Sequence, residues 1–152
     1  FMLTTVHLLT GAAIGKVTGN IYLAAPLAVV SHYALDFIPH YNPKPVKGYL
    51  EKGYTGADKL DLVLKALEPA IGLAAGIFLV VANPPELRLP IFIGGLFGWL
   101  PDLLVFLDWK FNIGKDNFIR KVEKKFHRHT SFAKGILIQV CMISIALIIL
   151  WK

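Results

Sequence analysis

Ionisable side chains interrupt several apolar stretches of this chain, and their types are those that bind divalent metal ions. Imidazoles occur at His7 and His32, and carboxylates at Asp36, Glu68 and Asp102. A charged group inside hydrocarbon costs about 3 kcal/mol on insertion scales, so each one requires a partner or a function. Imidazole nitrogens and carboxylate oxygens are typical zinc ligands, and a zinc site takes about four of them. The residue types therefore indicate a metal site, with a hydrogen bond between packed helices as the alternative for any single residue.

The spacing of these residues supports a shared site. His32 and Asp36 are four residues apart, so their side chains lie on one helical face and can reach the same ion. At about 1.5 Å per residue, His32, Glu68 and Asp102 each lie about 10 Å inside the ends of their expected helices. Three carboxylates with two or three imidazoles would also suit a site for two metal ions.

The elements that carry these residues have the composition of membrane spans. The chain has 152 residues, of which 55% are hydrophobic and only 17% charged, and its mean hydropathy is +0.59. Soluble domains are typically about 45–50% apolar. We predict an all-α integral membrane bundle of four or five transmembrane helices, forming a single domain over residues 1–152. Each expected span approaches the roughly 20 residues that cross a bilayer; the five are Leu3–Gly19, Ile21–Ile38, Leu62–Ala82, Leu89–Leu107 and Phe132–Trp151.

The basic residues indicate the orientation of this bundle. Pro39–Lys59 and Lys110–Thr130 hold four and seven Lys or Arg residues, and five spans place both segments on one side. The positive-inside rule makes that side cytoplasmic, so we expect a multi-pass inner-membrane protein with a cytoplasmic N-terminus. Asn112–Thr130 has the pattern of a basic amphipathic helix lying on the membrane surface, which favours anionic lipids rather than nucleic acid as partners. Its His127 and His129 belong either to the site or to a solvated cluster facing lipid.

Alternating helix directions bring the buried ionisable groups together. His7 lies near the start of the first span, His32 and Asp36 near the end of the second, and Asp102 near the end of the fourth. Glu68 lies near the start of the third span. All of them are therefore expected in the cytoplasmic half of the bundle.

Two stretches of the chain resemble known membrane proteins. His32-Tyr-Ala-Leu-Asp36-Phe-Ile-Pro39-His40, together with His7 and with Pro101-Asp102 in a later apolar helix, resembles the membrane-bound metal-dependent hydrolase family that includes a LexA-regulated inner-membrane protein. The opening His7-Leu-Leu-Thr10-Gly11-Ala12-Ala-Ile-Gly15 is similar to the start of small bacterial membrane proteins. The His-x3-Asp element is similar to the one with which zinc-dependent phospholipase C and S1-type nucleases bind zinc. The resemblance implies a divalent metal, zinc with manganese or magnesium as alternatives, held by His32 and Asp36, with His7, His40 and Asp102 completing the set of ligands.

Two functions from different classes remain open. The first is a metal-dependent hydrolase at the cytoplasmic membrane face, acting on a phosphoester such as that of a lipid headgroup. His32, Asp36 and Asp102 would hold the metal, and Glu68 or His7 would accept the proton. The second is a non-catalytic accessory subunit of a larger membrane complex, in which the polar cluster is a hydrogen-bond network or a metal staple. An ion or proton carrier ranks last, because the outer half of the bundle has few polar residues to line a water path.

Overall fold

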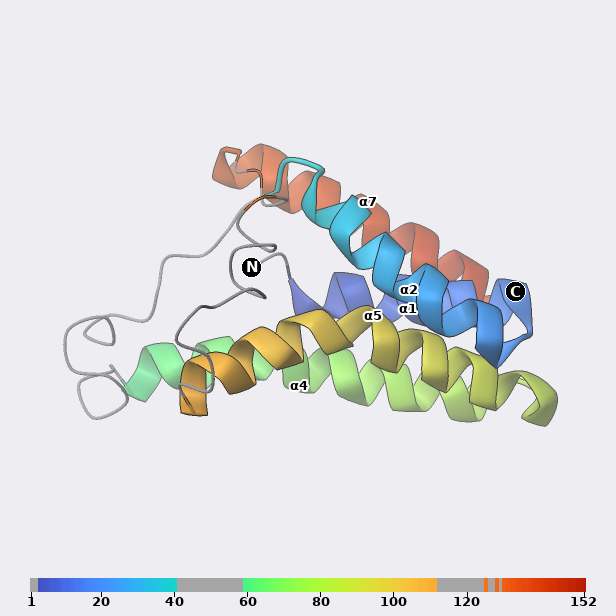
Figure 1. Ribbon diagram of the computed structural model, residues 1–152. Helices are drawn as coiled ribbons and strands as arrows, with labels where there is room; N and C mark the ends of the chain where they lie inside the picture. Colours follow the sequence, from blue (N-terminus) through green and yellow to red (C-terminus); the bar gives the residue numbers. More distant parts are fainter. Residues whose placement is uncertain (1–2, 41–58, 112–124, 126–127, 129) are drawn as a thin grey trace.

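Five helices account for most of the residues that the structure describes, and Figure 1 shows how they are arranged. The computed structural model describes residues 3–40, 59–111, 125, 128 and 130–152. Within these residues the chain has no β-strand, so the predicted all-α class is confirmed. Each expected apolar segment forms one helix; the five are α1 (Thr4–Thr18), α2 (Ile21–Asp36), α4 (Lys59–Ala82), α5 (Pro85–Phe111) and α7 (Phe132–Trp151). The basic surface helix expected over Asn112–Thr130 lies almost entirely outside the described residues.

A two-residue turn joins α1 and α2. Gly19 ends α1 in the left-handed conformation, with φ of 58°, and its N–H donates to the carbonyl of Gly15 at 3.0 Å. Glycine adopts this conformation without the steric cost that a Cβ atom brings. The side chain of Asn20 then accepts a hydrogen bond from the N–H of Tyr22 at 2.8 Å and caps α2. The chain therefore reverses at Gly19-Asn20 and returns α2 alongside α1.

α1 is the central helix of the bundle. It contacts each of the other four helices, while α2 and α4 also pack against α5, and Figure 1 shows α1 in the middle of the bundle. Its closest neighbour is α5, because Gly11 and Gly15 present bare backbone there. A Cβ atom added at Gly11 would overlap the carbonyl of Gly94, and one added at Gly15 would overlap the carbonyl of Pro90. Small residues four apart thus bring the two backbones into contact, as is common between membrane helices.

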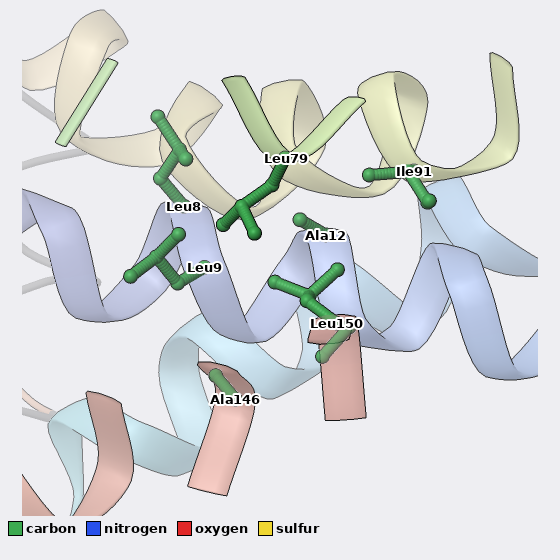
Figure 2. Close-up of a cluster of buried hydrophobic side chains, with 8 residues drawn as sticks. Leu8, Leu9, Ala12, Leu79, Ile91, Ala146 and Leu150 are labelled. Carbon is green, nitrogen blue, oxygen red and sulfur yellow. The ribbon is translucent and has the colours of Figure 1, made fainter. Parts of the chain in front are cut away.

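The apolar core surrounds α1, and Figure 2 shows it from close range. Side chains from α1, α4, α5 and α7 meet here, and each is at most 6% exposed. α1 has small residues on the face that carries its glycines and large ones beside it, so the neighbouring helices interlock around it. The labelled members are Leu8, Leu9, Ala12, Leu79, Ile91, Ala146 and Leu150.

Polar side chains close the end of the bundle at which α1, α4 and α7 terminate. The amine of Lys16 donates to the carbonyl oxygen of Leu150 at 2.9 Å. The amide of Asn83 donates to the same carbonyl at 3.1 Å and to that of Leu79 at 2.7 Å. The last carbonyls of a helix have no partner within it, so these side chains replace the water that would otherwise satisfy them.

Two helices are long and apolar enough to cross a membrane. They are Pro85–Leu107, within α5, and Phe132–Trp151, which is α7. α1 and α2 have 15 and 16 residues, so each is about 22–24 Å long, shorter than the roughly 30 Å of a bilayer core. The structure therefore has two helices of spanning length and composition, and the membrane location and the full set of four or five spans remain predictions.

Candidate metal centre

Four buried ionisable side chains from three helices meet at the end of the bundle opposite Lys16. His7 comes from α1, His32 and Asp36 from α2, and Asp102 from α5. One ligand atom each from His7, His32 and Asp102 lies within 4.8 Å of the others. The exposed fractions are 1% for each histidine, 0% for Asp36 and 6% for Asp102. The structure thus brings together four of the five metal ligands expected from the sequence.

Asp36 lies between the two imidazoles. Its Oδ1 is 3.2 Å from Nε2 of His7, and its Oδ2 is 3.4 Å from Nε2 of His32. The two rings lie against each other, with centroids 4.0 Å apart and planes inclined by 31°. The predicted sharing of one helical face by His32 and Asp36 therefore places their side chains in contact, and α1 adds His7 from the other side.

The backbone of α5 determines the tautomer of His32. Its Nδ1 lies 2.9 Å from the carbonyl oxygen of Gly98, and a carbonyl can only accept, so Nδ1 must carry the proton. In the neutral imidazole, Nε2 then holds a lone pair directed toward Asp36. A backbone carbonyl on the far nitrogen is the outer contact that most metal-binding histidines have, because it fixes the ring orientation and raises the basicity of the ligand nitrogen.

This arrangement fits a cation better than it fits a set of hydrogen bonds. The Nε2 lone pair of His32 and the carboxylate oxygen of Asp36 are both acceptors, so a proton or a metal ion must lie between them. Both oxygens of Asp102 and Nδ1 of His7 are buried and have no hydrogen-bond partner among the described residues. Buried charges normally occur in pairs or as metal ligands. Two carboxylates and two imidazoles are a donor set for one divalent ion.

The contact between α1 and α5 positions this cluster. A Cβ atom added at Gly98 would lie 2.5 Å from the carbonyl oxygen of His7, so only glycine lets α5 approach α1 at this level. Asp102 follows Gly98 by four residues, about one helical turn, and therefore projects on the same side of α5 as that contact. The glycines thus determine the distance between His7 and Asp102.

Glu68 lies near the cluster and has a different set of contacts. Its Oε1 accepts a hydrogen bond from the N–H of Thr5 at 2.8 Å, and its carbonyl accepts from the hydroxyl of Thr5 at 3.3 Å. The carboxylate therefore satisfies one of the unpaired N–H groups at the start of α1, where negative charge is also favoured by the helix dipole. The sequence predicts correctly that Glu68 lies at the same end of the bundle as the cluster. In the structure its carboxylate points to the backbone of α1.

A substitution at Glu68 separates capping from proton transfer. Glu68→Gln keeps an oxygen that can accept from Thr5 and loses only the charge, so we expect the free energy of unfolding to fall by about 0.3–1 kcal/mol. Thermal unfolding in detergent measures this change. A general base contributes about 10²–10⁴-fold to a rate, so a loss of turnover of that size, with the metal retained, would show that Glu68 accepts the proton instead.

His40 is buried beyond the end of α2 and does not belong to the His7, His32 and Asp102 group whose ligand atoms lie within 4.8 Å of one another. Its Nδ1 hydrogen-bonds the carbonyl of Ile38 at 2.9 Å. Its backbone N–H donates to the carbonyl of Arg128 at 3.2 Å, and its carbonyl accepts from Thr130 at 3.1 Å. His40 thus anchors the segment that precedes α7. The other two histidines considered from the sequence, His127 and His129, lie outside the described residues.

The pH dependence of stability reports on His40. Burial lowers the pKa of its imidazole below the ordinary value of 6.5, so the folded protein disfavours the protonated ring. The stability from the neutral ring is complete above pH 6.5 and is lost as the pH falls toward the lower pKa of the folded state. We expect the melting temperature to decline below pH 6.5, and to decline less in His40→Gln. Equal pH profiles for the two proteins would contradict this assignment.

Two contributors to the site were not found from the sequence. The first is the carbonyl of Gly98, which contacts His32 through the backbone and so leaves no side-chain pattern in the sequence. Arg128 was one cation of a basic segment, whereas the structure places its guanidinium 3.9 Å over the ring of Phe37 and its N–H 3.3 Å from the carbonyl of Asp36. In this segment the sequence drew attention only to His127 and His129 as site candidates, and their pattern does not indicate which residue Arg128 contacts.

Comparison of the chain with protein-family models, with curated proteins and with solved structures gives no match. The class of the protein therefore rests on its own residues. It is a helical bundle with two candidate membrane helices and a buried His/His/Asp group that could hold a metal ion.

Proposed function

We propose that the protein is a membrane-embedded, metal-dependent hydrolase that acts on a phosphoester at the cytoplasmic face of the inner membrane. The observation that carries this proposal is the approach of His32 Nε2 to Asp36 Oδ2 at 3.4 Å within a buried cluster. The Gly98 carbonyl holds the proton of His32 on the other nitrogen. A divalent ion between the two ligand atoms accounts for this arrangement and matches the hydrolase family that the sequence resembles.

The surface of the helices supports the membrane part of the proposal. Large apolar side chains are widely exposed on the outside of the bundle; examples are Ile71 at 65%, Phe78 at 61% and Leu137 at 64%. Soluble monomers rarely expose large continuous apolar surface, because water would favour association through it. The last turns of α1 and α7 lie side by side, since Lys16 donates to Leu150, so these two helices run in the same direction, which suits an odd number of spans. The positive-inside rule, applied to the basic segments, supports a metal centre on the cytoplasmic side.

The roles of the side chains follow from the need for an open position. Four protein ligands complete a structural zinc site, whereas catalytic sites use three. With His32, Asp36 and Asp102 as ligands, His7 remains beside Asp36, with Nε2 3.2 Å from Oδ1. His7 can therefore accept a proton while Asp36 orients its ring. A divalent ion held here supplies Lewis-acid stabilisation of the charge that develops on the phosphoester.

Near-complete burial of the cluster favours a second candidate, an accessory subunit in which the metal has a structural role and holds the helices together. None of the four side chains is more than 6% exposed, and structural sites are closed in this way. In that case all four side chains act as ligands, and the bound ion stabilises the contact of α1 with α2 and α5.

Metal analysis combined with a turnover assay tests both candidates. The protein is purified in detergent, stripped with a chelator, reconstituted with zinc or manganese, and assayed with a chromogenic phosphodiester in mixed micelles. Stoichiometric metal, with turnover that His7→Asn abolishes while the metal is retained, would support the hydrolase. Stoichiometric metal that raises the melting temperature, without turnover, would support the accessory subunit with a structural metal. The absence of stoichiometric metal after reconstitution would overturn both.

A further inference from the structure

An apolar groove runs along the bundle between α1, α2 and α7. It has a volume of about 430 Å³, and its walls come from all three helices. Ala13 and Ala146, at 4% and 2% exposed, form its floor, and larger apolar side chains form its sides. Representative wall residues are Thr10, Val17, Leu27, Leu35, Met142 and Ile149.

One end of this groove lies beside the metal centre. Thr10 is less than one helical turn from His7 on α1, and Leu35 directly precedes Asp36 on α2. The groove continues along α1 as far as Val17 and Thr18. A long apolar molecule in the groove would therefore have one end next to the ligand cluster and the other about 12 Å away along the helix axis.

A cation lies near the same end. Arg128 and Thr130 hydrogen-bond the backbone at the end of α2, and Thr130 lies just before α7; these two helices are walls of the groove. The N–H of Arg128 donates to the carbonyl of Asp36, and its guanidinium lies over Phe37. Phe37 is itself 49% exposed. The groove is thus apolar along its length, and a positive charge and an exposed aromatic ring lie near one end of it, beyond its lining residues.

The walls of the groove select among occupants. The surface that lines it is almost entirely apolar, as the hydrocarbon chain of a lipid requires. A cation near one end of the groove further favours a molecule with an anionic head, since charge complementarity of this kind attracts phosphate.

We propose that the groove binds one acyl chain of an anionic glycerophospholipid, with the phosphate of that lipid lying between Arg128 and the metal centre. This inference rests on the proposed function for the role of the lipid as substrate, and it defines the substrate class of that site. The binding of the lipid can be tested separately from its hydrolysis.

Substitutions on α7 provide a matched pair for the test. Met142→Trp places a bulky ring in the groove, whereas Val140→Trp places the same ring two residues away, at a position that is 53% exposed and does not line the groove. Each protein is incubated in detergent with phosphatidylglycerol or with phosphatidylcholine of the same acyl chains. Native mass spectrometry counts the bound lipid, and metal content is measured on the same samples.

We expect about one phosphatidylglycerol per chain, at least fivefold less in Met142→Trp, and little change in Val140→Trp. Arg128→Gln should reduce the preference for phosphatidylglycerol over phosphatidylcholine. Equal lipid binding by the two tryptophan variants would overturn the proposal, as would a dimer that Met142→Trp dissociates without a change in lipid.

The two measurements separate the groove from the proposed function. If the protein binds phosphatidylglycerol in this pattern and takes up no metal, lipid binding in the groove is supported and the hydrolase proposal is contradicted. If the protein binds metal and hydrolyses a soluble phosphodiester but retains no lipid, the hydrolase proposal is supported and lipid binding in the groove is contradicted.

Discussion

Replacement of Gly94 with alanine should destabilise the bundle by about 3 kcal/mol, because overpacking of a close contact costs typically 1–3 kcal/mol and this contact is between two backbones. The added Cβ atom would overlap the carbonyl of Gly11 and also approach the backbone nitrogen of Gly15. Neither atom can move without displacing α1. Because α1 carries His7, the variant should also bind metal more weakly than the unmodified protein.

Gly95→Ala is the matched control for that substitution. A Cβ atom there would lie 3.4 Å from the carbonyl oxygen of Leu8 and 3.6 Å from Cβ of Ala12, close to ordinary contact distances. Alanine is also favoured over glycine inside a helix by about 0.5–1 kcal/mol, so this variant should be as stable as the original or slightly more so. Thermal unfolding in detergent compares the two. Similar melting temperatures for both alanine variants would show that α1 and α5 do not depend on backbone contact at Gly94.

Loss of metal from His32→Ala is the second large effect that we expect. Outer contacts of a metal ligand typically contribute 10–100-fold to affinity, so removal of a direct ligand should weaken zinc binding by more than about 100-fold. Asp102→Asn should have a similar effect, because it removes the charge of a carboxylate that has no hydrogen-bond partner within the described residues. Competition with a fluorescent chelator measures the affinity of the reconstituted protein.

His40→Gln is the control for the metal measurement. His40 is as buried as His32, with 0% and 1% exposed, so the two substitutions perturb similar environments. The ligand atoms that lie within 4.8 Å of one another come from His7, His32 and Asp102 and not from His40, so the His40 variant should keep its zinc. If His40→Gln lost zinc as completely as His32→Ala, the set of ligands would have to include His40, as the family resemblance implies.

The helices could be predicted well because each is a long apolar segment bounded by residues that cannot continue it. The predicted span at 132–151 coincides with α7, and the predicted start at Ile21 follows the Gly19-Asn20 turn that ends α1. α5 begins at Pro85, four residues before the apolar run, because proline is well suited to the first helical position. Apolar composition could not reveal this start, since Glu86 and Arg88 are polar.

The position of each site residue along its helix could be predicted, but the direction in which its side chain points could not. Alternating helices place His7, Asp36, Glu68 and Asp102 at one end of the bundle, as we expected. The rotation of each helix about its axis depends on packing, which a single sequence does not contain. Glu68 is directed toward the N–H of Thr5 for this reason, while Asp102 joins the imidazoles because Gly98 packs against α1.

The hydrogen bond between Lys16 and Leu150 constrains how the protein is made. Lys16 lies in the last turn of α1, and its acceptor lies 134 residues later, in the last turn of α7. An ammonium group without a partner is costly in hydrocarbon, and the imidazole of His7 likewise gains its partners only from α2 and α5. In the proposed membrane bundle, α1 therefore reaches its final environment only after α2, α5 and α7 have been made.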